Sequence, residues 1–182
     1  MSKQGLEVHE KALRKTGVLS SAELACCPGV PSAQRLRQGP VAVIECSEEI
    51  PCNPCEGNCP RGAIRVGSTV TSQPCLDPEG CVGCALCVSR CPGLAIFVVD
   101  LSSDDGDHVS IPYEFLPLPE SGELVEGVDR EGRAVCTART LTVDARERND
   151  RTAVVTLLTP KGLGMDVRFF RRVGGGKNSG RQ

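Results

Sequence analysis

Hydrophobic and polar positions change their spacing along the chain of 182 residues, and the changes separate two kinds of predicted structure. In residues 1–45, short apolar runs follow two helix-capping residues, Ser20, which has Glu23 three positions later, and Ser32. This pattern predicts short helices in an otherwise irregular, extended arm. In residues 109–173, short apolar runs alternate with turn residues at hairpin spacing, which predicts a small antiparallel β-barrel or sandwich.

Turn signals divide the C-terminal part of this pattern further. A polar, aspartate-rich run at residues 101–108 predicts a linker before the β-domain, and the Gly-rich residues 174–182 predict a flexible tail after it. The strands of the β-domain are expected at residues 122–128, 134–143, 152–158 and 166–172, with turns at 129–132 and 147–150.

The cysteines change this picture, because nine of the twelve lie between Cys46 and Cys91. The last four of the nine follow the spacing C-x2-C-x2-C-x3-C-P, the run that holds a cubane cluster in bacterial ferredoxins. We expect Gly80 and Gly83 in this loop to let the backbone approach the cluster closely. The four cysteines of the run are Cys81, Cys84, Cys87 and Cys91.

A second copy of the spacing C-x2-C-x3-C-P begins 32 residues earlier and is incomplete. The position that would match the leading cysteine of the run holds Glu49. Cys46, three residues before Glu49, is the natural substitute on a longer loop. If Cys46 is not a ligand, a three-iron cluster is the alternative at this copy. The cysteines of the copy are Cys52, Cys55 and Cys59.

Zinc is the main rival, since cysteine pairs two residues apart also form tetrahedral thiolate sites. Zinc sites combine two separated pairs, whereas this run is a consecutive triple followed by Cys-Pro, which favours a cluster. We expect the cysteines outside the two copies to bind no metal. Cys75 is interpreted as a free thiol, Cys26 and Cys27 as small buried hydrophobes, and Cys136 as part of a strand.

Residues 46–100 resemble a bacterial-type ferredoxin domain with two 4Fe–4S clusters. The resemblance implies a βαββαβ fold, so the fold class expected for the whole chain is α+β, with this domain followed by the small β-barrel or sandwich. It also implies the two ligand sets. One cluster would be held by Cys59, Cys81, Cys84 and Cys87, and the other by Cys46, Cys52, Cys55 and Cys91.

A narrower resemblance rests on residues 28–32, 39–46 and 50–55, which are similar to the small iron–sulfur subunits that accompany FAD-dependent amino-acid dehydrogenases of the proline, hydroxyproline or hydrogen-cyanide-synthase type. It implies an electron-transfer subunit, not catalytic alone, that relays single electrons to or from a flavoprotein oxidoreductase. Residues 109–173 are then expected to dock this partner. An iron–sulfur redox sensor or regulatory module is the alternative function.

Composition and charge narrow the function classes. The formal net charge is −2 and aromatic residues make up 3% of the chain, so neither phosphate attraction nor base stacking is expected, and we predict no nucleic-acid partner. The strongly apolar stretch at residues 94–99 is too short to cross a bilayer. The first fifteen residues are charged and show no secretory signal, so a cytoplasmic location is expected.

Two local concentrations of charge remain open to interpretation. An acidic group near the first copy either steers a basic redox partner or is a solvated loop face. A basic group near the C-terminus is interpreted as a strand with a charged outer face. The acidic residues are Glu45, Glu48, Glu49 and Glu56, and the basic ones are Arg168, Arg171, Arg172, Lys177 and Arg181.

Overall fold

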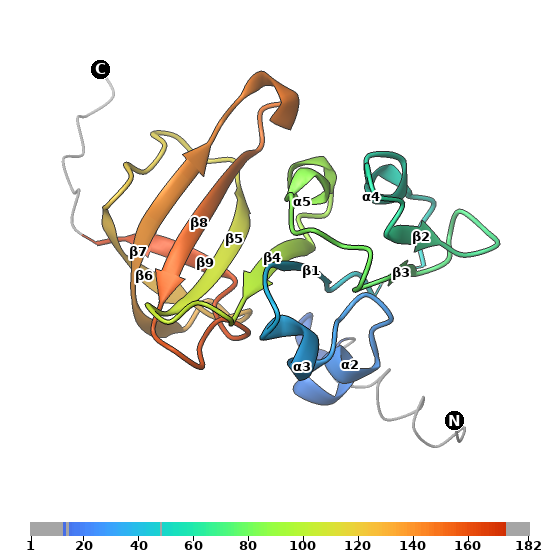
Figure 1. The fold of residues 1–182 in the computed structure, drawn as a ribbon, viewed down its shortest axis with the longest axis horizontal. Coiled ribbons are helices and arrows are strands. Elements are labelled where there is room, and N and C mark those ends of the chain that lie inside the picture. Colours follow the sequence, from blue (N-terminus) through green and yellow to red (C-terminus); the bar gives the residue numbers. More distant parts are fainter. Residues whose placement is uncertain (1–12, 14, 48, 174–182) are drawn as a thin grey trace.

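The N-terminal part contains two short helices whose caps follow from the sequence. The structure is a computed structural model, and it describes residues 13, 15–47 and 49–173. Helix α2 (Ser21–Cys26) begins after Ser20, where a capping box with Glu23 is formed. Helix α3 (Ala33–Leu36) begins after Ser32, whose hydroxyl accepts the N–H of Arg35 at 3.2 Å. Both helices pack below the central strands in Figure 1.

The cysteine-rich segment folds in the order strand, helix, strand, strand, helix, strand. Its outer strands β1 and β4 pair antiparallel, with Val41 opposite Val99. Its inner strands β2 and β3 form a separate two-stranded sheet. The elements are β1 (Val41–Ile44), α4 (Pro54–Gly57), β2 (Ile64–Val66), β3 (Pro74–Leu76), α5 (Leu86–Arg90) and β4 (Ile96–Asp100). This is the order that the βαββαβ expectation requires, while membership of that fold family stays a prediction.

The C-terminal part continues the same sheet. Strand β4 also pairs with β5, and the full antiparallel order is β1-β4-β5-β8-β7-β6-β9. The sheet curls on itself (Figure 1). The curl brings the ring of Tyr113, at the end of β5, onto that of Phe170 in β9, with 5.0 Å between the ring centroids. The elements are β5 (Asp107–Tyr113), β6 (Leu124–Val128), β7 (Ala134–Asp144), the 3₁₀ helix η1 (Glu147–Asn149), β8 (Ala153–Thr159) and β9 (Phe169–Arg172).

Strands β1 and β4 are buried on both faces and join two hydrophobic cores. Side chains alternate between the faces of a strand, so neighbouring residues enter different cores. One face packs with the curled sheet and the other with the cysteine-rich helices. The first face is formed by Val41, Val43, Phe97 and Val99, and the second by Ala42, Ile44, Ile96 and Val98. The two halves of the chain therefore fold around a shared pair of strands.

The structure corrects three of the predicted boundaries. The division between residues 45 and 46 falls too late, because β1 already belongs to the cysteine-rich unit. The predicted linker 101–108 and β-domain 109–173 are not separate, because β5 begins at Asp107 and pairs with β4. Asp107 is buried there since its carboxylate accepts the N–H groups of Gly162 and Gly164. The predicted tail 174–182 lies outside the described residues.

The segment before β1 is not an extended arm. Leu36 is buried in the core around β1, and its carbonyl accepts the N–H of Leu101 at 2.9 Å. Pro40 packs against Gly83, where an added Cβ would lie 2.6 Å from the Pro40 Cβ, and Gly83 has a φ of +64°. Gly83 is therefore required for packing against this segment, and it also lines the recess beside helix α5, so its expected approach to a cluster stays a prediction.

Candidate cysteine-lined metal centres

Four cysteines surround one recess beside helix α5, which we name site I. The recess encloses about 330 Å³, counting the part that is open to solvent. Cys87 is buried in α5, whereas Cys84 is exposed. Ala42, Ile64 and Val98 form apolar walls. The cysteines that line site I are Cys59, Cys81, Cys84 and Cys87.

Four other cysteines surround a second recess beside helix α4, which we name site II. It encloses about 390 Å³ by the same measure. Cys55 is buried in α4, and Ile44, Ile50 and Ile96 contribute apolar walls. Cys46, which follows β1 after Glu45, reaches this recess from its longer loop. The cysteines that line site II are Cys46, Cys52, Cys55 and Cys91.

The last cysteine of each sequence copy lies in the site of the other copy. Cys59 belongs to the first copy and lines site I, whereas Cys91 belongs to the second and lines site II. The local geometry repeats with the 32-residue period: the N–H of Ala63 donates to the Cys59 Sγ at 3.3 Å, and the N–H of Ala95 donates to the Cys91 Sγ at 3.4 Å. The repeat in sequence is therefore a repeat in structure.

Sites I and II are neighbours along β1 and β4. The pair Ala42–Val98 borders site I, and the pair Ile44–Ile96 borders site II. Two residues along a strand correspond to about 7 Å. The two recesses therefore lie side by side on one face of the same pair of strands.

Burial affects one thiol in each site strongly. It raises the pKa of Cys87 to about 12, and the nearby Cys81, Cys84 and Cys59 thiols act in the same direction. Burial likewise raises the pKa of Cys55 to about 11, with smaller contributions from Cys91 and Cys52 that also raise it. These thiols are protonated at neutral pH, so a metal group that binds them must displace their protons.

The donor set of each site fits an iron–sulfur cluster. Four thiols form each set, and thiolates select zinc, copper(I) or iron–sulfur clusters. In the part of the chain that the structure describes, no three Cys, His, Asp or Glu side chains are arranged to hold a single metal ion. Each set of four cysteines lines one recess. Backbone N–H groups also point at Cys59, Cys91 and Cys81, the last from Ala42 at 3.4 Å.

Comparison with known proteins finds similarity over part of the chain. A ferredoxin-type protein, NapF of Haemophilus influenzae, is 38% identical over 58 residues, which cover 31% of this chain and 33% of NapF. Protein Pixie of Drosophila melanogaster is 33% identical over 95 residues, and ABC transporter E family member 1 of Arabidopsis thaliana is 31% identical over 96 residues. The alignments with Pixie and with the ABC transporter each cover 46% of this chain. This chain spans about a sixth of the length of the latter two relatives.

Other comparisons are negative. No protein-family model matches the chain, and no solved structure matches it. In the described residues no helix is both long and apolar enough to cross a membrane.

The four remaining cysteines line neither recess. Cys75 is exposed in β3, and Cys136 is half-buried in β7. Cys27 is buried, with its Sγ 3.5 Å from the Glu23 carbonyl oxygen, but Cys26 is exposed at the end of α2. The interpretation of Cys26 as a buried hydrophobe is therefore wrong, because its side chain faces outward from the short helix.

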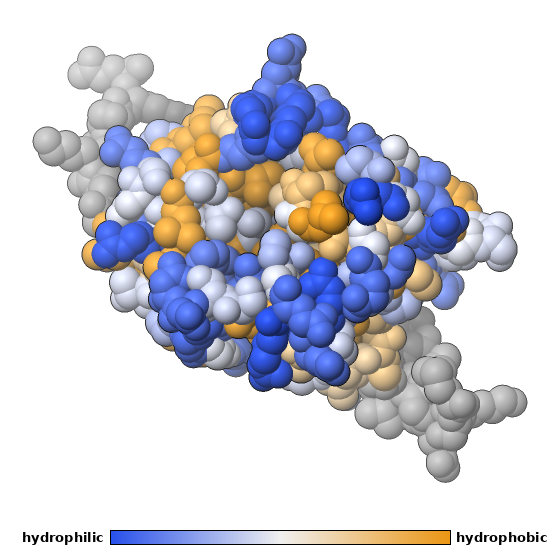
Figure 2. Space-filling model, in the orientation of Figure 1, coloured by the Kyte–Doolittle hydropathy of each residue, from blue (hydrophilic) through white to orange (hydrophobic). Residues whose placement is uncertain are grey.

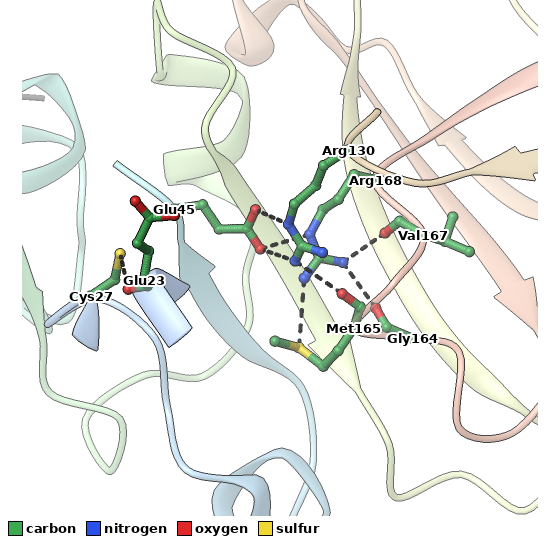
Figure 3. Close-up of polar contacts among 8 residues, drawn as sticks. All are labelled: Glu23, Cys27, Glu45, Arg130, Gly164, Met165, Val167 and Arg168. Atoms are coloured by element: carbon green, nitrogen blue, oxygen red, sulfur yellow. Dashed lines mark hydrogen bonds and ion pairs between the residues drawn. The ribbon is translucent and has the colours of Figure 1, made fainter. Parts of the chain in front are cut away.

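Glu45, immediately before Cys46, forms a buried ion-pair network across the molecule (Figure 3). Its carboxylate accepts the Nε–H of Arg130 at 2.8 Å and the Nε–H of Arg168 at 2.8 Å. Burial works to raise the pKa of the Glu45 carboxyl, but the hydrogen bonds and charges of the two arginines outweigh it and hold that pKa below its usual value. The guanidinium of Arg168 also lies 4.8 Å from the centre of the Phe97 ring.

This network corrects two interpretations of surface charge. Glu45 does not belong to an exposed acidic group, because its side chain is 7% exposed. Arg168 does not lie on a charged outer face, because its side chain is 4% exposed. Glu49 is exposed and Glu56 half-buried, while Glu48 lies outside the described residues. Lys177 and Arg181 lie outside them too.

An open depression borders site I on its exposed side. It encloses about 1100 Å³, including open solvent, and extends from Cys84 to Ser110 and Thr156 on the sheet. Arg146 and Arg148 at its rim both bind the Asp144 carboxylate. Figure 2 shows the β7–β8 connection, which carries these arginines, as a hydrophilic projection at the top with hydrophobic surface below it.

Proposed function

We propose that this chain is an iron–sulfur electron carrier that holds two 4Fe–4S clusters. The observation that carries the proposal is the exchange of Cys59 and Cys91 between two recesses, each lined by four cysteines. In two-cluster ferredoxins the last cysteine of each run ligates the other cluster. When bound, such clusters supply one-electron redox chemistry at neighbouring positions.

The surroundings of the thiols support this role. Backbone N–H groups of Ala42, Ala63 and Ala95 donate to cysteine sulfurs, and such bonds stabilise negative charge on a ligand. Apolar side chains from β1 and β4 limit the access of water. Cys84 is exposed beside an open depression, which provides a surface for electron exchange with a partner. Partial similarity to the ferredoxin-type protein NapF agrees with the same role.

In this proposal the partner is a flavoprotein oxidoreductase subunit, as the resemblance to dehydrogenase subunits implies, and this chain is not catalytic alone. The β-strands after residue 107 do not form an independent docking module, because they share a sheet and a core with the cysteine-rich unit. Docking of the partner would therefore involve the whole folded unit, both the cysteine-rich segment and the curled sheet. Copurification of the intact protein without oxygen, with a flavin assay of what is bound, tests this partner.

The cluster assignment is tested with cysteine variants of the full chain. The anaerobic wild type is expected to contain about eight iron and eight sulfide per chain. Cys59→Ala and Cys91→Ala should each lose about half of the iron. Electron paramagnetic resonance of reduced Cys59→Ala should match that of Cys84→Ala, and Cys91→Ala should match Cys52→Ala. Cys75→Ala is the control and should keep both signals.

Two results would reject the assignment. Stoichiometric zinc without a visible charge-transfer band would show that the sites hold single ions. If Cys59→Ala instead resembled Cys52→Ala, each sequence copy would fill its own site and the exchange would be wrong.

A further inference from the structure

Arg35 in helix α3 is a buried cation whose partners are all backbone carbonyl groups. Arg35 is 9% exposed. Its Nε donates to the Pro78 carbonyl at 2.8 Å, its Nη1 to Gly39 at 3.1 Å and its Nη2 to Cys81 at 3.0 Å. Among the described residues, the ion pairs found join other cations to carboxylates, and Arg35 takes part in none of them.

A guanidinium in this position needs a compensating charge. Removing a cation from water is unfavourable unless it is hydrogen-bonded and an opposite charge lies nearby. Asp77 and Glu79 flank Pro78, but both residues are exposed, and Asp77 accepts the N–H of Glu79. Carbonyl dipoles satisfy the N–H groups of Arg35 without neutralising its charge. One of those carbonyls belongs to Cys81, whose thiol lines site I.

The three carbonyls tie Arg35 to site I directly. Cys81 lines the recess with its sulfur while its carbonyl accepts from Arg35. Gly39 precedes Pro40, which packs against Gly83 in the same cysteine loop. Arg35 therefore joins the segment before β1 to the start of the cysteine loop, at Pro78 and Cys81. No residue of the cysteine copies signals this contact, since Arg35 lies 46 positions before Cys81.

We propose that Arg35 is the fixed counter-charge of site I and raises the reduction potential of that site. The inference rests on the proposed function. Four thiolates make the ligand shell of a cluster negative, and reduction adds one further negative charge. A fixed positive charge stabilises the reduced state more than the oxidised state, so Arg35 raises the potential of site I. At site II, Glu45 next to Cys46 binds both Arg130 and Arg168, which leaves one net positive charge in that network.

Arg35 touches no reacting atom, so it is a positioning residue, and its charge must be separated from its hydrogen bonds. Arg35→Lys keeps the positive charge but cannot reproduce the planar set of hydrogen bonds to three carbonyl groups. Arg35→Gln removes the charge and keeps a donor. Arg37→Gln is the matched control, because Arg37 ends the same helix, is exposed and donates to the Ala33 carbonyl.

The test is a redox titration of the full chain with both sites loaded, followed by electron paramagnetic resonance. The signal that Cys59→Ala loses identifies site I. Arg35→Gln should shift the midpoint potential of site I to more negative values and leave that of site II unchanged. Arg35→Lys should keep the site I midpoint close to that of the wild type, and Arg37→Gln should change neither.

Three outcomes overturn the proposal: an unchanged site I midpoint in Arg35→Gln, an equal shift in Arg35→Lys and Arg35→Gln, or an equal shift at both sites. If Arg35→Gln does not retain iron at site I, Arg35→Lys decides. A lysine variant with about four irons at site I and the wild-type midpoint supports the charge. A lysine variant that also loses them shows that Arg35 acts through its hydrogen bonds and overturns the proposal. A wild type without clusters would reject the proposed function instead, before any variant is compared.

Discussion

Site I draws Cys81, Cys84 and Cys87 from an unbroken run, whereas site II draws Cys46 from the end of a strand. The two sites share a repeated geometry, including the N–H bonds to Cys59 and Cys91. Their charged surroundings differ, since one buried arginine lies beside site I and a carboxylate with two arginines lies beside site II. Repetition therefore relates the two recesses except at Cys46, while segments outside the repeat place different charged groups beside them.

The largest expected effect comes from removing the part of the chain that both sites depend on. A chain that ends at residue 108 loses most of β5, leaves the edge of β4 unpaired and exposes Phe97 and Val99. We expect it to aggregate and to retain iron at neither site, as measured by iron content and circular dichroism. If it keeps about eight irons, residues 46–100 fold independently, as their sequence predicts.

A smaller effect, directed at site II, is expected from Arg168→Met. This change leaves the buried Glu45 with Arg130 alone, and breaking a buried ion pair costs about 3 kcal/mol. We expect a lower urea midpoint of unfolding and loss of iron from site II before site I. Arg171→Met is the control, because Arg171 pairs with Glu126 at the surface, and it should change the free energy of unfolding by less than about 0.5 kcal/mol. Equal effects of the two variants would show that the network does not support site II.

The next prediction concerns Cys46, which stands in for the missing leading cysteine of the first copy. Cys46→Ala should lose the site II signal or convert it to that of a three-iron cluster, while the site I signal stays as in the wild type. Iron content and electron paramagnetic resonance measure both. If both signals are unchanged in Cys46→Ala, another group completes site II. A double variant that replaces both Cys27 and Cys46 would then test whether Cys27 is that group.

The smallest expected effect concerns the rim of the depression beside Cys84. Hydrogen bonds from Arg146 and Arg148 hold the pKa of Asp144 below its usual value, so its stabilising contribution is present at neutral pH and is lost only in acid. Asp144→Asn should lower the free energy of unfolding by less than about 1 kcal/mol, equally at about pH 6 and about pH 8. It should shift the potential of site I slightly upward and leave site II unchanged. If the potential of site II shifts more than that of site I, the placement of this rim beside site I is wrong.

Local signals in the sequence predict much of this structure. Ser20 and Ser32 mark the helix starts, and the repeated cysteine spacing marks the segment that forms both recesses. The resemblance to two-cluster ferredoxins implies the same two groups of cysteines, and their role as ligands stays a prediction. What the sequence did not reveal depends on pairings between distant residues. Glu45 and Arg168 are 123 positions apart, and each reads locally as a surface charge.

The linker prediction failed for a related reason. The run around Asp107 is polar and contains Gly106, which is typical of a loop. Asp107 is nevertheless buried in β5, because its carboxylate satisfies backbone N–H groups of a turn more than 50 positions later. Charge and hydropathy alone do not distinguish such an internal acceptor from a solvated side chain.

The exchange of Cys59 and Cys91 also has a consequence for assembly. Each half of the repeat supplies a thiol to the other half's site, so filling one recess orders part of the second. Coupling between two sites is reciprocal, and the sign here is favourable in both directions. Loading should therefore be cooperative, with fully loaded and empty chains outnumbering half-loaded ones when iron is scarce. If the chain holds two clusters as proposed, iron shortage would then reduce the number of loaded chains, while each loaded chain keeps both clusters.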